Sequence, residues 1–122
     1  CIGENRTEKK NKKTVSVLKK QLFKVLDKRL NKNNIIIAYE PIWSIGTGEL
    51  PSRADLVHTT IQIKGTLSQI FGNKIPPVLY GGSVDDETIY FFKDIRVIDG
   101  FLIGGASKSS KKFIDIIRNY YR

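Results

Sequence analysis

The sequence predicts an α/β fold in which parallel strands alternate with helices. Short apolar runs at residues 35–39, 78–80 and 97–103 predict three strands, and the isoleucines of the first favour burial on both faces. Helical patterns precede the first run and follow each of the three. This order is typical of βα units and therefore of a parallel sheet. No linker interrupts the pattern, so we expect residues 1–122 to form a single domain.

The helices are predicted from apolar residues at helical spacing and from signals at their ends. The clearest start is Ser52, which is followed three residues later by Asp55 in a capping pattern, and that helix ends near Gly72. The other helices are predicted over residues 14–30, 85–92 and 107–121. In the last of these, four apolar residues are expected to face inward, namely Phe113, Ile116, Ile117 and Tyr120.

Composition excludes several classes of protein. The 122 residues are 40% hydrophobic and 27% charged, which is typical of a globular protein, and no apolar run is long enough for a transmembrane helix. The single cysteine, Cys1, excludes an internal disulfide and a cysteine-based zinc site, and we expect neither metal nor cofactor. With no signal peptide pattern, the expected compartment is cytoplasmic. Because the chain contains no methionine, we expect it to be a fragment, a processed product or an incomplete record.

The positive charge is concentrated near the N-terminus. The net charge is +9, and residues 1–34 hold 11 Lys and Arg against 3 Asp and Glu. One interpretation is a surface for nucleic acid. The other is a solvated helix face, which we favour because no aromatic residue lies between Lys9 and Lys20 to stack on bases. Neither nucleic acid nor a membrane is therefore the expected partner.

Each predicted strand ends in residues suited to chemistry. Glu40 follows the first, Gly81-Gly82-Ser83 the second and Gly104-Gly105 the third. The carboxyl ends of parallel strands form the ligand-binding edge of α/β folds. Glycine N–H groups can approach an anion closely and a serine hydroxyl can donate to it, so these turns predict a phosphate pocket.

The loop after Glu40 has the composition of a lid. Pro41 follows the carboxylate at once, Trp43 is the only tryptophan, and Gly46-Thr47-Gly48 forms a flexible tip. A lid that excludes water over a carboxylate suits a general base acting on a small phosphorylated substrate. Taken without its surroundings, Glu40 would be interpreted as a surface carboxylate at a strand end. We interpret Asp99 as structural and the only histidine, His58, as a surface or packing residue.

Taken together, these motifs resemble triosephosphate isomerase. The resemblance runs in order through residues 1–122, in Cys1-Ile-Gly-Glu4, Ala38-Tyr-Glu-Pro-Ile-Trp-Ser-Ile-Gly-Thr-Gly48, Tyr80-Gly-Gly-Ser-Val84 and Asp99-Gly-Phe-Leu-Ile-Gly-Gly-Ala-Ser107. It implies the C-terminal half of a (β/α)8 TIM barrel, from the segment after strand 5 through helix 8. It also implies an isomerase of glycolysis and gluconeogenesis, which interconverts dihydroxyacetone phosphate and glyceraldehyde 3-phosphate through an enediolate, with Glu40 as the base.

The resemblance also assigns roles around Glu40. It implies phosphate contacts from Gly46, Ser83, Gly104 and Gly105. It implies a lid over residues 41–51, with the lid and its contacts formed by Pro41, Ile42, Trp43, Ser44, Ile45, Thr47, Gly48, Glu4 and Tyr80. Trp43 is expected to meet Glu4 when the lid is open. In the family, the tyrosine that matches Tyr80 makes a hydrogen bond with a backbone N–H near the C-terminal hinge of the lid. If Pro51 holds that position in this chain, the N–H is absent.

The resemblance implies partners as well. A family barrel has eight strands, and its electrophilic histidine, its phosphate-facing lysine and its dimer loop come from the N-terminal half. We therefore expect a missing N-terminal half as partner, a homodimeric assembly, and doubtful activity for this chain alone. The alternatives are an inactive remnant, another phosphate-binding barrel of isomerase or aldolase type, and a basic module that binds nucleic acid.

Overall fold

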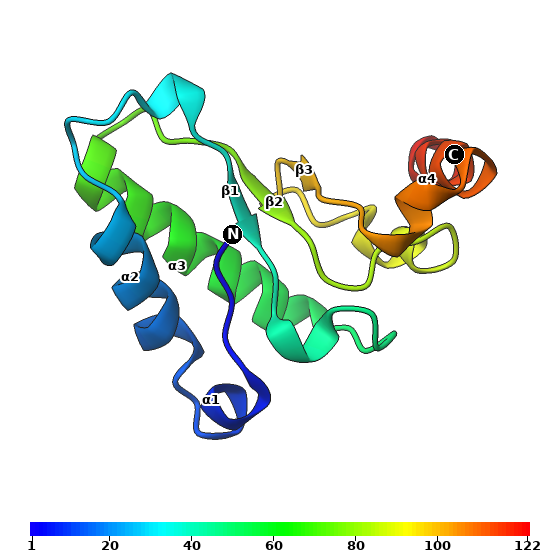
Figure 1. Ribbon diagram of the computed structural model, residues 1–122, viewed down its shortest axis with the longest axis horizontal. Coiled ribbons are helices and arrows are strands. Elements are labelled where there is room, and N and C mark those ends of the chain that lie inside the picture. The colour runs from blue at the N-terminus through cyan, green and yellow to red at the C-terminus, as the bar shows by residue number, and fades with distance from the viewer.

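A three-stranded parallel sheet forms the centre of the protein (Figure 1). The computed structural model describes all residues from Cys1 to Arg122. Strands β1 (Ile37–Tyr39), β2 (Val78–Tyr80) and β3 (Gly100–Phe101) lie in that order, with Tyr39 opposite Tyr80 and Tyr80 opposite Phe101. Ile2 makes an isolated parallel bridge to Tyr39, so the start of the chain runs beside β1. The predicted α/β class and its parallel sheet are confirmed.

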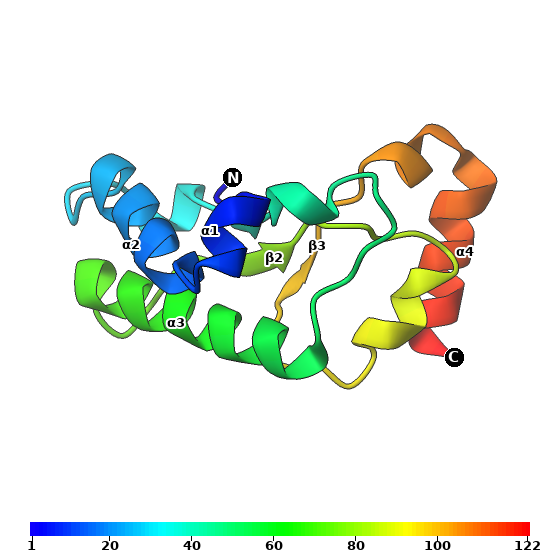
Figure 2. The ribbon, with the colours of Figure 1, turned by 90° about the horizontal axis from the view of Figure 1, so that it is seen from below.

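Helices lie beside the sheet and at one end of it. The helices are α1 (Arg6–Lys10), α2 (Thr14–Val25), α3 (Arg53–Phe71) and α4 (Ser110–Tyr121), with short 3-10 helices η1 (Lys32–Asn34), η2 (Ile42–Ser44), η3 (Thr88–Phe92) and η4 (Gly105–Lys108). α2 packs against α3, and α3 contacts β2. Figures 1 and 2 show α4 at the opposite end of the molecule from α2, where it packs on η3 and η4.

The core lies between the sheet and these helices. α2 contributes Leu18 and Leu22, which are 2% and 0% exposed. The inner face of α3 is formed by its buried residues, which are Leu56, Thr59, Thr60, Ile63, Thr66 and Leu67. Aromatic rings continue the core across the strands, in the order Tyr39, Tyr80, Phe92 and Phe101.

Two predicted helices are shorter than their apolar patterns suggested. The first ends at Val25 and not at residue 30, because the Asp27 carboxylate accepts a hydrogen bond from the Arg29 N–H at 2.8 Å and fixes a turn. The Asp85 carboxylate similarly accepts from the Thr88 N–H at 2.7 Å, and only the 3-10 helix η3 follows. In both places a side chain competes with the helix for backbone donors.

The third strand and the last helix also differ from prediction. β3 covers two residues of the predicted run 97–103, although hydrogen bonds to β2 extend from the Asp99 N–H to the Leu102 N–H. β3 ends the sheet with a neighbour on one side only. α4 begins at Ser110 and not at residue 107, because the Ser109 hydroxyl caps it by accepting from the Lys112 N–H.

Helix α1 was not predicted. It starts with a capping box in which the Asn5 side chain accepts from the Glu8 N–H and the Glu8 carboxylate accepts from the Asn5 N–H. Asn5 and Glu8 have the spacing that signals such a start, but no apolar periodicity follows it.

The apolar face of α4 is only partly covered. Ile116 is 5% exposed as predicted, but Phe113 and Ile117 are 41% and 48% exposed, so their predicted inward placement is wrong within this chain. In Figure 1, β3 is the strand that lies nearest to α4, and it has a neighbouring strand on one side only. Separately, none of the helices has both the length and the apolar character needed to cross a membrane.

Candidate active site

The sheet register places Glu40 next to the end of β2. Tyr39, Tyr80 and Phe101 form one row across the sheet, so the residues that follow them, Glu40 and Gly81 among them, meet at its carboxyl edge. A Cβ atom on Gly81 would lie 2.7 Å from Cγ of Glu40. The Glu40 side chain is half-buried and has no hydrogen bond or ion pair within the chain. Its carboxylate therefore has no partner within the chain that would compete with a ligand.

The backbone of Glu40 is fixed from the N-terminal segment. Its N–H donates to the Ile2 carbonyl at 2.8 Å. Gly3 packs so closely on the Glu40 carbonyl that a Cβ atom there would overlap it. Gln21 of α2 in turn holds Gly3, with its side chain accepting from the Gly3 N–H and donating to the Gly3 carbonyl, both at 2.9 Å. Sequence analysis missed Gln21, because nothing distinguishes it from the other polar residues of its helix.

The predicted lid is docked onto the turn after β2. The Ser83 hydroxyl accepts from the Gly48 N–H at 3.0 Å and donates to the Ser44 carbonyl. The buried Ser44 hydroxyl donates to the Glu49 carbonyl and lies 3.2 Å from the Tyr80 hydroxyl. Tyr80 thus contacts the lid through the hydroxyl of Ser44, and not through a backbone N–H at Pro51.

The tip of the lid has the backbone freedom that its glycines supply. Gly46 and Gly48 adopt φ values of +67° and +77°, which side chains other than glycine rarely adopt. The Thr47 hydroxyl donates within the loop, to the carbonyls of Trp43 and Ser44. The N–H groups predicted to bind phosphate make no hydrogen bond within the chain, namely those of Gly46, Gly104 and Gly105. Pro41 is buried, whereas Ile42 and Ile45 are 57% and 49% exposed.

A buried cluster of Glu4, Tyr39 and Trp43 joins the lid to the first strand and to the N-terminal segment. Glu4 is 0% exposed, and its carboxylate accepts from Trp43 Nε1 at 2.9 Å and from the Tyr39 hydroxyl at 3.2 Å. Burial raises the pKa of Tyr39 above its usual range, and the charge of Glu4 adds to this shift. Burial likewise raises the pKa of Tyr80 to about 12, against the effect of its hydrogen bond with Ser44. Both tyrosines therefore remain neutral donors near pH 7. The contact between Trp43 and Glu4, expected for an open lid, occurs here in a lid docked on Ser83.

Two further polar residues lie outside this site. Asp99 accepts from the Val78 N–H at 2.8 Å and from Lys64 Nζ at 2.9 Å, so its role is structural as predicted. His58 is exposed on α3. No group of three or more His, Cys, Asp or Glu residues is placed to hold a metal ion.

Comparison with known proteins identifies the family. Residues 1–120 match the family model described as Triosephosphate isomerase. The chain belongs to the triosephosphate isomerase family. The triosephosphate isomerase of Saccharomyces cerevisiae is 40% identical over 122 residues, covering 98% of this chain and 49% of that protein. The triosephosphate isomerase of Dehalococcoides mccartyi (strain CBDB1) is 41% identical over 121 residues, which cover 97% of this chain and 47% of that protein.

A solved structure agrees with this assignment. The crystal structure of triosephosphate isomerase from Bartonella henselae matches with a TM-score of 0.86 and 33% identity, and covers 100% of this chain and 50% of that one. The chain thus spans about half the length of the triosephosphate isomerases it matches, and its sheet corresponds to part of a TIM barrel.

We expect Ser83→Ala to loosen the lid. The change removes two hydrogen bonds between lid and turn, each worth about 0.5–1.5 kcal/mol, so amide exchange at Gly48 should speed up about 5- to 150-fold. Hydrogen exchange followed by NMR measures this. Ser68→Ala is the matched control, because Ser68 is exposed and its hydroxyl makes no hydrogen bond. Equal exchange in both variants would mean that Ser83 does not hold the lid.

Proposed function

We propose that this chain supplies the base, the lid and phosphate-binding turns of a triosephosphate isomerase. The reaction interconverts dihydroxyacetone phosphate and glyceraldehyde 3-phosphate, and we place it in cytoplasmic glycolysis and gluconeogenesis. One observation carries the proposal. The unpaired carboxylate of Glu40 lies at the carboxyl edge of a parallel sheet, directly before a lid docked on the neighbouring strand end.

Glu40 moves the proton in this proposal. Its carboxylate removes a proton from C1 of dihydroxyacetone phosphate, and the electrons of that C–H bond form the C1–C2 double bond of an enediolate. The negative charge gathers on the C2 oxygen, where an electrophile must stabilise it. Return of the proton to C2, with proton transfer between the two oxygens, gives glyceraldehyde 3-phosphate. With no competing partner within the chain, Glu40 is free for both transfers.

The lid and the turns hold the phosphate group and exclude water. The free N–H groups of Gly46, Gly104 and Gly105 are donors suited to an anion. Ser83 contributes by fixing the lid through Gly48 and Ser44. A closed lid keeps water from the enediolate, which can otherwise lose its phosphate.

We propose that the rest of the site comes from an N-terminal barrel half. The resemblance assigns to that half the electrophilic histidine and the phosphate-facing lysine, and the relatives are about twice as long as this chain. The exposed apolar face of α4 and the free edge of β3 are surfaces on which such a half could pack. As in the family, the assembled enzyme would be a homodimer, and this chain would form one partial domain of the barrel.

An assay of the assembled protein tests the proposal. By assembled protein we mean this chain together with the N-terminal half of a triosephosphate isomerase, joined in one polypeptide or supplied separately. Isomerisation should appear in the assembled protein and be lower by about 10²–10⁴ or more in either half alone, because each lacks catalytic groups. An assembled protein that folds but does not exceed its halves would show that this chain is an inactive remnant.

Gly81→Ala should displace the base without unfolding the protein. The new Cβ would lie 2.7 Å from Cγ and 3.2 Å from Cδ of Glu40, and this side chain can move away. It would also lie 3.2 Å from Cβ of Leu102, a contact that a shift of a few tenths of an ångström relieves. Misplacing a catalytic group by about 1 Å can cost 10²-fold, so kcat should fall by about one to two orders of magnitude while KM changes little. Steady-state kinetics measure both quantities. An unchanged kcat would mean that Glu40 need not sit against Gly81.

A further inference from the structure

A cavity lies beside the C-terminal end of the lid. It is open to solvent, has a volume of about 640 Å³, and is lined mainly by α1, the start of α2, the C-terminal end of the lid and the first turns of α3. None of the residues assigned to phosphate binding or proton transfer lines it. Its size is within the range of small-molecule sites, which is about 300–1,000 Å³. The cavity is therefore distinct from the residues assigned to proton transfer and phosphate binding, although Tyr39 and Trp43 of the cluster that supports the lid line it.

The walls of this cavity carry excess positive charge. Four basic residues line it, Arg6, Lys9, Lys10 and Lys12, against the two acidic residues Glu49 and Asp55. Both acids are already paired, Glu49 with Arg6 at 2.8 Å and Asp55 with Lys9 at 3.5 Å.

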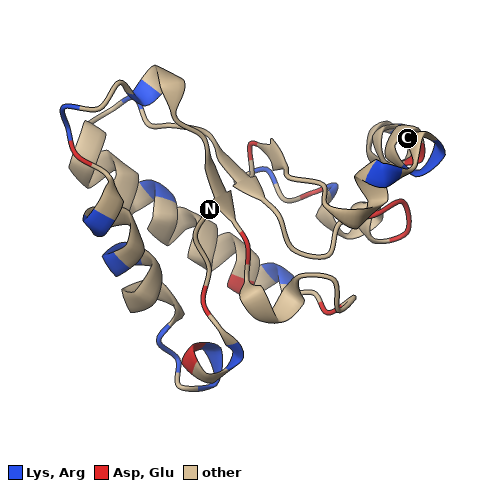
Figure 3. Ribbon diagram, in the orientation of Figure 1, with Lys and Arg blue, Asp and Glu red and all other residues tan.

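Lys10 and Lys12 have no ion pair in the structure. Figure 3 shows the basic residues of α1 and of the turn after it gathered at one corner of the molecule. The capped start of the 19-residue helix α3, at Ser52, forms another part of the wall. A helix start also favours negative charge.

We propose that this cavity binds a small anion with one or two phosphate groups. Lys10 and Lys12 would provide the unpaired charge, and Arg6 can bond two phosphate oxygens at once with its planar guanidinium. Only four of the fifteen lining residues are hydrophobic, so polar and charged side chains outnumber apolar ones. An apolar ligand would leave these groups unpaired, whereas an anion satisfies them.

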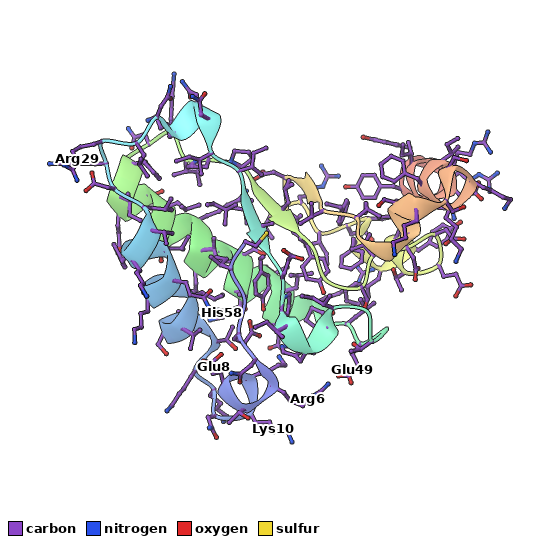
Figure 4. The ribbon with its side chains drawn as sticks, in the orientation of Figure 1. Arg6, Glu8, Lys10, Arg29, Glu49 and His58 are labelled. Carbon is purple, nitrogen blue, oxygen red and sulfur yellow. The ribbon has the colours of Figure 1, made fainter.

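The same basic residues contact the lid, so the site is coupled to it. Besides pairing with Glu49, Arg6 donates through Nη2 to the Trp43 carbonyl at 3.5 Å, and Lys9 Nζ lies 4.8 Å from the centre of the Trp43 ring. Figure 4 shows Arg6 and Glu49 side by side, with Lys10 on the same helix and His58 on α3. The Arg6–Glu49 pair is half-exposed, at 51% and 50%, and such pairs contribute little to stability. A bound anion can therefore take Arg6 from Glu49, and lid position and occupancy influence one another.

The only histidine of the chain provides the probe for this site. His58 lines the cavity and has no ion pair. With this chain labelled with ¹³C-histidine and the N-terminal half unlabelled, the assembled protein would be titrated with pyrophosphate at constant ionic strength. We expect the ring resonance of His58 to shift saturably.

Two pairs of variants decide the outcome. Lys10→Gln with Lys12→Gln should weaken pyrophosphate binding about tenfold or more, because it removes both unpaired charges. Lys20→Gln with Lys24→Gln is the matched control, since both lysines lie on α2 outside the cavity, and it should change binding less than about twofold. A linear shift without saturation, or equal weakening in both pairs, would overturn the proposal. So would binding that survives in the Lys10 and Lys12 variant and is displaced by triose phosphate, because it would belong to the substrate site.

Discussion

Replacing Glu40 by glutamine should lower kcat of the assembled protein by about 10²–10⁴ while leaving its stability almost unchanged. An amide cannot accept the proton from carbon, and loss of a general base costs a factor of this size. The substitution keeps the shape of the side chain, which makes no hydrogen bond or ion pair within the chain that could be lost. Initial rates of isomerisation and thermal unfolding of the same samples measure the two effects.

Glu87→Gln is the matched control for this change. Glu87 is exposed, and its carboxylate makes no hydrogen bond or ion pair, so the charge changes equally without touching the site. We expect its kcat to remain within about twofold of the original. A similar loss in both variants would attribute the effect to net charge and not to proton transfer.

Gly3→Ala should cause the largest loss of stability among the glycine changes considered. The added methyl group would overlap the backbone carbonyl of Glu40, which cannot swing aside as a side chain can. Overpacking of this kind costs about 1–3 kcal/mol, and the two hydrogen bonds between Gly3 and the Gln21 side chain hold Gly3 in place against relaxation. Urea denaturation of the assembled protein measures the change in the free energy of unfolding.

Gly65→Ala, the same substitution at another glycine, should raise the free energy of unfolding where Gly3→Ala lowers it. Gly65 lies in the interior of α3, is exposed, and has no atom within 4 Å of an added Cβ. Alanine should stabilise the helix there by about 0.5–1 kcal/mol. If Gly3→Ala left the free energy of unfolding unchanged or raised it, the close contact with Glu40 would not exist in solution.

Much of the fold could be predicted because the local signals and the tertiary contacts agree. Ser52 caps α3 as its spacing with Asp55 indicated, and Val78–Tyr80 forms β2 with the predicted bounds. Prediction failed where one side chain overruled the apolar pattern, as Asp27 does at the end of α2. It also failed on α4, where Phe113 and Ile117 have the periodicity of a buried face but this chain supplies nothing to cover them.

The residues of the candidate site could be predicted from the sequence, but the contacts between them could not. Glu40, Ser83 and the glycine turns were predicted because they follow apolar runs, and ligands bind at the carboxyl edge of a parallel sheet. The sequence motifs did not indicate that the Gln21 side chain hydrogen-bonds Gly3 beside Glu40. Nor did they indicate that the hydroxyls of Ser44 and Tyr80 lie within hydrogen-bonding distance. Both depend on three-dimensional proximity between polar residues that carry no local signal. The basic segment that we interpreted as a solvated helix face also lines a cavity beside the lid.

Transfer of deuterium from solvent to product tests the central claim most directly, namely that Glu40 carries the proton between C1 and C2. Dihydroxyacetone phosphate would be incubated in D₂O with the assembled protein and with its Glu40→Gln variant, and the C2 position of glyceraldehyde 3-phosphate examined by NMR. We expect deuterium at C2 at the rate of turnover with the original protein, and incorporation slower by about 10²–10⁴ with the variant. Incorporation at an undiminished rate in the Glu40→Gln variant would contradict the account, because another group would then be the base.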